Sequence, residues 1–248
     1  MARYLINITI ILMIFTNTIV EAKVYKEDFE TQKSIKRFNV LVGDWYRIKD
    51  EGNYVYVVDG KRWGNKLAGD IRPKIAKLFG EKYYAYMDNI KKYYYFPLSI
   101  YEVPVKSGRY EITVRIKFIS GKVDQCGGIV FGMKDPGNYF VLRSNFLENN
   151  CVLFGYQDGK RYTIKWVQLK NKGILQNKVW HRLKVIVNGN IVKGYVNNLK
   201  LMEIDFSKGI SGKRRRFRTK FFLSKGKVGL WSKADSKTYF DDFILKIE

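Results

Sequence analysis

The sequence predicts an all-β fold in which short antiparallel strands form a sandwich or a barrel. After residue 109, apolar and polar residues alternate within many segments, which is typical of strands with one buried face. Turn sequences separate these segments at intervals of roughly 8–12 residues. Hydrophobic residues make up 46% of the 248 residues and charged residues 28%, so the chain can bury a sizeable core.

The predicted strands follow one another from residue 109 to the end of the chain. In 109–119, five apolar residues alternate with polar or charged ones. The turn sequence DPGN at 135–138 joins CGGIVFGMK to YFVLRSNFL as a hairpin, and DGK at 158–160 joins CVLFGYQ to RYTIKWVQL. The remaining strands are expected in WHRLKVIVNG, IVKGYVNN, LKLMEIDF, KVGLWSK and TYFDDFILKI.

Two insertions interrupt the strand pattern. Apolar residues recur at helical spacing within 72–92, and Pro73 suits a helix start, so we expect a short helical insertion there. The second insertion, 207–226, is basic, because six of the eight residues 213–220 are Lys or Arg. Since the helical insertion is too short to bury a core alone, residues 23–248 are predicted to form one domain.

The first 22 residues predict a secretory signal peptide. Arg3 precedes an apolar stretch that ends at Val20, and the small residues of Val20-Glu21-Ala22 favour cleavage after Ala22. We therefore expect a secreted or periplasmic protein whose membrane contact is at most peripheral after cleavage. The alternative is an uncleaved anchor, although the stretch is short for a membrane span.

The formal net charge of +23 indicates a polyanionic partner. For an exported protein the candidates are acidic polysaccharide, anionic lipid and nucleic acid outside the cytoplasm, and we expect no specific nucleic-acid recognition. The alternative is a compositional bias, since Lys, Ile, Tyr and Asn are all abundant.

The two cysteines are predicted to remain unpaired. Cys126 and Cys151 begin strands that are two positions apart if 139–147 pairs between them, which separates them by roughly 9–10 Å. A disulfide needs Cα atoms within about 7 Å, so a bridge requires a different strand order. His181, the one histidine, has no matching partners for a zinc site or a catalytic triad and is expected to be structural.

Three stretches carry a resemblance to a known superfamily. They are GGIVFGMKDPGNYFVLRSNFLENNCVLFGYQDGKR, VWHRLKVIVNGNIVKGYVNNLKLMEIDF and GKVGLWSKADSKTYFDDFIL. They resemble the concanavalin A-like lectin/glucanase superfamily, most closely its laminin-G-like and DUF1080-type (3-keto-disaccharide hydrolase-like) domains. The resemblance implies a two-sheet antiparallel jelly-roll sandwich. It implies no single activity, because the superfamily includes lectins, glycosidases, lyases and adhesion modules.

A glycan-binding face is the main functional hypothesis. Tyr139, Arg143 and Asn145 share one face of their strand by parity, and Tyr156 or Trp166 is expected beside them on the next strands. Aromatic rings stack on sugars while Asn and Arg form hydrogen bonds around them, so these residues suit an open concave sheet face. The alternative is an ordinary row of solvent-facing side chains.

The basic insertion supplies three further ligand-binding candidates, Arg214, Arg215 and Arg216. Arginine forks bind phosphate, sulfate or uronate groups in a bidentate manner. The alternative is a solvated loop without a specific ligand.

A metal site is predicted where the first and last strands meet. The resemblance implies a calcium ion at this junction, and Asp28, Glu30 and Asp242 offer the oxygen ligands that Ca²⁺ prefers. Because consecutive residues point to opposite faces of a strand, only one of Asp241 and Asp242 is expected to face the site. The alternative is a set of solvated carboxylates.

The sequence offers no convincing catalytic motif. Glu203 and Asp205 have the spacing of paired carboxylates, but Ser207 stands where a third acid is expected. We therefore predict an exported, non-catalytic carbohydrate-binding module, for acidic glycans of the cell envelope. The alternatives are a glycoside hydrolase or polysaccharide lyase of the same fold, and a structural envelope protein.

Overall fold

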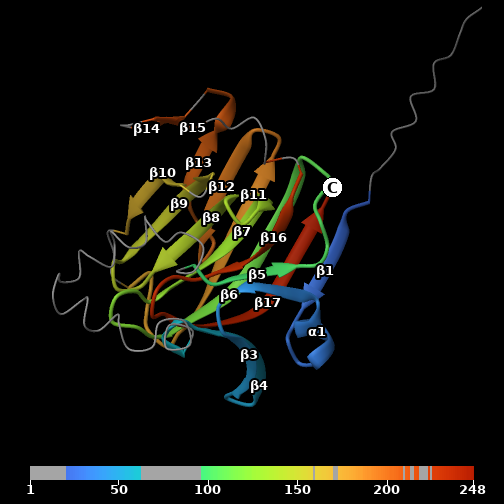
Figure 1. Cartoon of the computed structure of the whole chain (residues 1–248), viewed down its shortest axis with the longest axis vertical. Coiled ribbons are helices and arrows are strands. Elements are labelled where there is room, and N and C mark those ends of the chain that lie inside the picture. The colour runs from blue at the N-terminus through green and yellow to red at the C-terminus, as the bar shows by residue number, and fades with distance from the viewer. Residues whose placement is uncertain are drawn as a thin grey trace, which may run out of the picture.

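The computed structural model confirms the predicted sandwich of two antiparallel sheets (Figure 1). It describes residues 21–62, 96–158, 160–169, 173–208, 210–212, 215–217, 223 and 225–248. The predicted helical insertion at 72–92 and nearly all of the predicted signal peptide lie outside the described residues. Within the described ranges the helical segments are α1 (Gln32–Lys36), a 3-10 turn at Phe206–Lys208 and residues 60–62. No helix in those ranges is long and apolar enough to cross a bilayer.

Sheet A has eight strands among the described residues, and its edge-to-edge order is far from the chain order. Its path is β13 (Leu199–Asp205), β12 (Ile191–Val196), β11 (Trp180–Asn188), β6 (Arg109–Ser120), β17 (Lys237–Ile247), β4 (Asn53–Asp59) and β3 (Trp45–Asp50). The first strand, β1 (Lys23–Glu27), pairs antiparallel with β17, so the first and last strands are neighbours as predicted.

Sheet B has seven strands in the described ranges. Its path is β10 (Lys160–Gln168), β9 (Asn150–Gln157), β8 (Asn138–Asn145), β7 (Cys126–Asp135), β16 (Lys227–Trp231), β5 (Leu98–Tyr101) and β2 (Phe38–Val42). Strands β7 to β10 follow the chain as successive hairpins. A separate hairpin of β14 (Ile210–Gly212) and β15 (Arg215–Phe217) lies within the predicted basic insertion, and β14 packs near β10.

The core between the sheets follows directly from the alternation in the sequence. The inward residues of β6, which include Ile112, Ile116 and Phe118, are fully buried, whereas their outward neighbours remain partly exposed except for Lys117, which is buried. Burying each such side chain contributes roughly 1.5–3 kcal/mol. On β12, a Cβ added at Gly194 would lie 2.9 Å from Met202 and 3.0 Å from Leu142, so the close approach of the sheets favours glycine there.

Sheet B is also buried on its outer face. Phe96 stacks on Trp231 with ring centroids 5.3 Å apart and meets Tyr156 edge-on at 5.4 Å. Together with Tyr139 and Val141 these residues belong to a second apolar cluster, separate from the core between the sheets. Two buried faces explain why β7, β8 and β9 contain continuous apolar runs instead of a strict alternation.

The two cysteines are free and buried, as predicted. Cys126 belongs to the apolar cluster on the outer face of sheet B, and Cys151 belongs to the core between the sheets. Since β8 pairs between their strands and they lie on opposite faces, they cannot form a bridge without rearrangement. Burial raises the pKa of the Cys126 thiol to about 12 and that of Cys151 to about 11, so both thiols are unreactive in the folded protein.

Candidate functional site

Strand register places the predicted glycan-binding residues on one face of sheet B. Tyr139 pairs with Tyr156, Arg143 pairs with Val152, and Val152 pairs with Trp166. The rings of Tyr139 and Tyr156 stack with centroids 4.3 Å apart. The parity argument therefore assigned these side chains to the same outer face correctly.

The expectation that this face is open is wrong for four of the five residues. Tyr139, Arg143, Asn145 and Tyr156 are each at most 2% exposed. Phe96 and Trp231 contribute to this burial by packing in the same apolar cluster. Trp166 differs, because it lies on the edge strand β10 and is 49% exposed.

A buried arginine organises the polar end of this face. The Nη2 of Arg143 donates to Glu148 Oε2 at 2.7 Å and to Asn150 Oδ1 at 2.6 Å. The Glu148 side chain is 40% exposed, so its carboxylate contacts solvent while Arg143 and Asn150 hold it by hydrogen bonds. Burial opposes ionisation of Glu148, but the charge of Arg143 and hydrogen bonds from Asn150 and Arg143 outweigh it and lower the pKa of the carboxyl.

The same network continues into the interior around Asp124. Asn145 Nδ2 donates to Asp124 Oδ1 at 2.6 Å, and Lys233 Nζ lies 2.8 Å from Asp124 Oδ2. Arg143 Nη1 approaches Asp124 at 3.6 Å. The positive charges of Arg143 and Lys233 thus compensate the negative charges of Asp124 and Glu148 in largely apolar surroundings.

We define the Trp166 surface as Trp166, Gln168 and Glu148. Gln168 Nε2 donates to the main-chain oxygens of Glu148 and Asn149, both at 2.9 Å, and Trp166 Nε1 donates to Gln168 Oε1 at 3.5 Å. The exposed ring and the amide therefore lie where β10 ends and β9 begins, beside the main chain of Glu148, whose ionised carboxylate is partly exposed in the same loop. Gln168 and Glu148 were not predicted as site residues from the sequence, although Gln168 shares the parity of Trp166 on β10.

The basic insertion lies partly within the described structure. Arg215 and Arg216 belong to β15, where they pair with Gly212 and Ser211. Arg214 lies outside the described residues. Because β14 packs near β10, the main chain of this hairpin lies close to the strand that carries Trp166.

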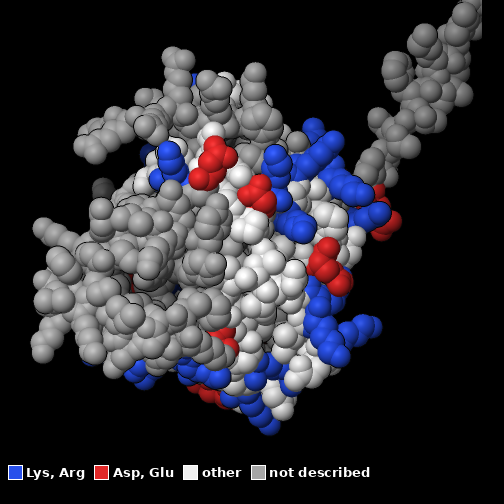
Figure 2. Space-filling model, viewed as in Figure 1, with Lys and Arg blue, Asp and Glu red and all other residues white. Residues whose placement is uncertain are grey.

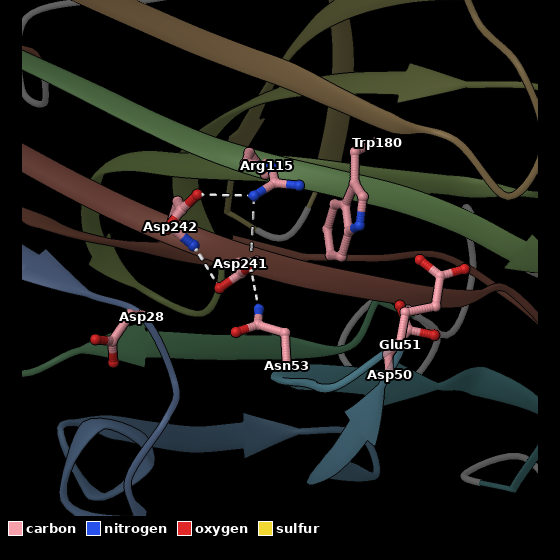
Figure 3. Close-up of a pocket in the computed structure, with 8 residues that line it drawn as sticks. All are labelled: Asp28, Asp50, Glu51, Asn53, Arg115, Trp180, Asp241 and Asp242. Carbon is pink, nitrogen blue, oxygen red and sulfur yellow. Dashed lines mark hydrogen bonds and ion pairs between the residues drawn. The ribbon is translucent and has the colours of Figure 1, made fainter.

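The predicted metal residues lead to a pocket on the outer face of sheet A, which we call the carboxylate pocket (Figure 3). It has a volume of about 360 Å³ and lies between the β3–β4 hairpin tip and the central strands. Eight residues line it: Asp28, Asp50, Glu51, Asn53, Arg115, Trp180, Asp241 and Asp242.

A β-bulge directs both consecutive aspartates into this pocket, contrary to the expectation that only one would face it. Asp242 has a φ of 47°, and the pairing of β17 with β6 shifts between Asp241 and Ile244. Arg115 Nη1 consequently lies 3.8 Å from Asp241 and 3.0 Å from Asp242 (Figure 3). Bulges of this kind reorient side chains and often lie next to functional sites.

The predicted calcium ligands are only partly brought together. Asp28 and Asp242 line the carboxylate pocket, but Glu30 accepts a hydrogen bond from the main chain of Tyr54 at 3.0 Å and does not line it. Asp28 and Glu30 lie after the end of β1 at Glu27, and Phe29 between them has a φ of 58°. No group of three or more His, Cys, Asp or Glu side chains suited to a metal occurs in the described ranges, so calcium stays a prediction.

Cations cover part of the ring of Trp180 and connect it to the hairpin tip. The Arg115 guanidinium lies 4.7 Å from the ring centroid and Lys117 Nζ lies 5.1 Å from it. Lys117 Nζ also lies 2.5 Å from Asp50 and 3.4 Å from Glu51. These contacts fix the hairpin tip over the sheet, so the pocket is formed without a ligand.

The titration of Asp241 predicts a measurable pH dependence. Burial raises its pKa from 3.8 to about 6, so the folded protein binds more protons than the unfolded chain between those values. This contribution to stability is full below about pH 4 and is lost as the pH rises through 6. We expect Asp241→Asn to change the difference in unfolding free energy between pH 4 and pH 7 by roughly 2 kcal/mol. Urea unfolding at both pH values tests this, and an unchanged pH slope would contradict the assignment.

His181 has a structural role, as expected. Its ring is buried, and its nitrogens contact the Gln176 main chain and Asn197 Nδ2 at 2.9–3.0 Å. These contacts fasten the 173–180 loop and the β12–β13 turn to the start of β11.

Comparison with known proteins identifies similar folds but no sequence family. No family model matches the chain, and no curated protein matches it. The fold is similar to that of a protein of unknown function with a galectin-like fold from Bacillus subtilis, with a TM-score of 0.55, 12% identity, and coverage of 90% of this chain and 96% of that one. It is also similar to carbohydrate-binding module CBM66 from Bacillus subtilis, with a TM-score of 0.53, 12% identity and coverage of 84% and 93%.

A putative glycosyl hydrolase from Parabacteroides distasonis has a similar fold as well. The TM-score is 0.53 at 12% identity, and the match covers 90% of this chain and all of the other. At such low identity these likenesses establish the sandwich fold alone, and they do not identify the chain as a laminin-G-like or DUF1080-type domain.

Proposed function

We propose that this chain is a non-catalytic glycan-binding module and that the Trp166 surface is its binding site. The observation that carries the proposal is the half-exposed Trp166 ring, which is hydrogen-bonded to the amide of Gln168; that amide contacts the main chain of Glu148, whose carboxylate is partly exposed. A sugar ring stacks its C–H face on an indole, and its hydroxyls donate to a carboxylate and exchange hydrogen bonds with an amide. Because Arg143 and Asn150 fix Glu148 beforehand, little side-chain entropy is lost on binding.

The fold neighbours support this proposal. They include a carbohydrate-binding module and a putative glycosyl hydrolase, and these descriptions favour a glycan as the ligand. Binding without hydrolysis suits the Trp166 surface, because it presents one carboxylate, whereas glycoside hydrolysis ordinarily uses two. Asp124, the nearest further acid in this network, is buried beneath Arg143.

We propose further that the preferred glycans are acidic and lie outside the cytoplasm. The net charge is +23, and the β14–β15 hairpin of the basic insertion lies near β10. Arg161, which pairs with Tyr156, lies over Phe154 at 4.9 Å on the same face of sheet B. In Figure 2, Lys and Arg side chains lie along the right and lower edges of the uncharged area, with Asp and Glu side chains among them. The proposed export through residues 1–22 would bring the chain to envelope polysaccharide.

A glycan array tests the proposal. The protein without residues 1–22 is applied at low and high salt, each with and without EDTA. We expect binding to a restricted set of uronate or sulfate glycans that weakens at high salt but keeps its sugar preference. Loss of binding in EDTA would support calcium. Binding to every polyanion without sugar preference, or to no glycan, would overturn the proposed function.

A further inference from the structure

We propose that the carboxylate pocket is a second saccharide site, specific for sugars without acidic groups, and that the chain thereby bridges two glycan strands. This inference rests on the proposed function, since it adds a second site to a glycan-binding module. It concerns a different face of the sandwich and a different ligand chemistry.

The lining of the pocket has the groups that a saccharide needs. Trp180 offers an aromatic edge or face, and Asn53 and Arg115 offer N–H donors. The Asp242 side chain is 48% exposed and that of Glu51 is 80% exposed, so both present free acceptor oxygens to hydroxyl groups. A volume of about 360 Å³ lies within the usual range of small-ligand pockets.

Charge decides which saccharide fits. Five of the eight lining residues are Asp or Glu, and Arg115 is the one cation among them. Lys117, beneath the ring of Trp180, pairs with Asp50 and Glu51. A uronate or sulfate would meet several like charges here, whereas a neutral hexose or a protonated amino sugar would not. We therefore expect this pocket to reject acidic glycans.

The pocket is held ready by contacts within the protein. Asn53 Nδ2 donates to Asp241 Oδ2 at 2.8 Å, and the main chain of Asp242 donates to Asp241 Oδ1 at 2.8 Å. Asp241 thus acts as a positioning residue for its two neighbours. The left-handed conformation of Asp242 is an uncommon one for a residue with a side chain, and such conformations concentrate at functional sites.

The two sites lie on opposite faces of the molecule. Trp166 is on the outer face of sheet B, and the pocket is on the outer face of sheet A, with the shared core between the sheets. Stacked sheets are about 10 Å apart, so the two ligands would not contact each other. One molecule could therefore hold an acidic strand on one side and a non-acidic strand on the other.

A sandwich-capture assay tests this directly. Beads coated with polygalacturonate are loaded with the protein and then exposed to fluorescent glucose or glucosamine oligomers. We expect loaded beads to capture at least one of the two oligomers. Trp180→Ala should lower capture at least tenfold without reducing the loading of the beads, whereas Trp166→Ala should lower the loading itself. Asp242→Asn is a second, milder change that should weaken capture and leave the unfolding transition near that of the wild type.

The outcomes separate this inference from the proposed function. Capture of neither oligomer by fully loaded beads would overturn the second site and leave the Trp166 surface standing. Capture that Trp180→Ala and Asp242→Asn leave unchanged would overturn it as well. Loading that survives Trp166→Ala and fails with Trp180→Ala would instead overturn the Trp166 surface as the site of the proposed function.

Discussion

Replacing Arg143 by methionine is expected to destabilise the fold by about 3–5 kcal/mol, the usual cost of removing one partner from a buried ion pair. Arg143 is 2% exposed and contacts Glu148, Asn150 and Asp124. Without it, Asp124 keeps Lys233 as a cationic partner, but Asn150 and Glu148 lose their shared donor. Urea unfolding at neutral pH measures the change as a shift in midpoint at constant slope.

Arg182→Met provides the matched control for this prediction. Arg182 lies on the outer face of sheet A, and its side chain is exposed, so its loss should change the unfolding free energy by no more than about 0.5 kcal/mol. A loss of less than 1 kcal/mol in Arg143→Met would show that the buried network does not stabilise the outer face of sheet B in the way described.

Replacing Trp166 by alanine is expected to weaken glycan binding about tenfold or more while the unfolding free energy stays nearly constant. Exposed aromatic anchors contribute a large share of binding energy, and a loss of 1.4 kcal/mol corresponds to tenfold in affinity. Because half of the Trp166 ring is already in solvent, its removal leaves no large cavity in the core. Calorimetric titration with the best acidic glycan from the array, together with urea unfolding, measures both quantities.

Two tryptophan variants control this experiment. Trp166→Phe keeps a flat ring and should retain most of the affinity, whereas Trp180→Ala removes a tryptophan from the opposite face and should leave the affinity for an acidic glycan unchanged. Equal losses in Trp166→Ala and Trp180→Ala would indicate a general effect on folding and contradict the assignment of the site.

Alternation in the sequence was sufficient to predict which residues share a face. Since side chains in a strand alternate with a period of two, Tyr139, Arg143 and Asn145 had to point the same way, and strand register brings Trp166 to the same face. The separation of the two cysteines depended on 139–147 pairing between their strands, and β8 does pair with both β7 and β9. The alternation of side chains depends only on local strand geometry, so a few consecutive residues of the sequence are enough to predict it.

Exposure was not predictable in this way. The burial of Tyr139 and Tyr156 involves Phe96 and Trp231, which are distant in the chain and belong to other strands or connections. The continuous apolar runs in β7 to β9 were a sign of two buried faces, but an isolated run does not say which residues cover it.

Bulges and left-handed residues were the second source of error. A regular strand would send Asp241 and Asp242 to opposite faces, and the bulge that unites them depends on one residue with a φ of 47°. Phe29, between Asp28 and Glu30, is likewise left-handed, so these two acids are not related as they would be in a regular strand. These are single-residue conformations of non-glycine residues, and pattern analysis has no signal for them.

The structure of a complex with the best-bound oligosaccharide from the array tests the central claim most directly. We predict a sugar ring stacked on Trp166, with one hydroxyl donating to Glu148 and another in hydrogen-bond contact with Gln168. A sugar bound elsewhere, with the Trp166 ring still open to solvent, would contradict the account.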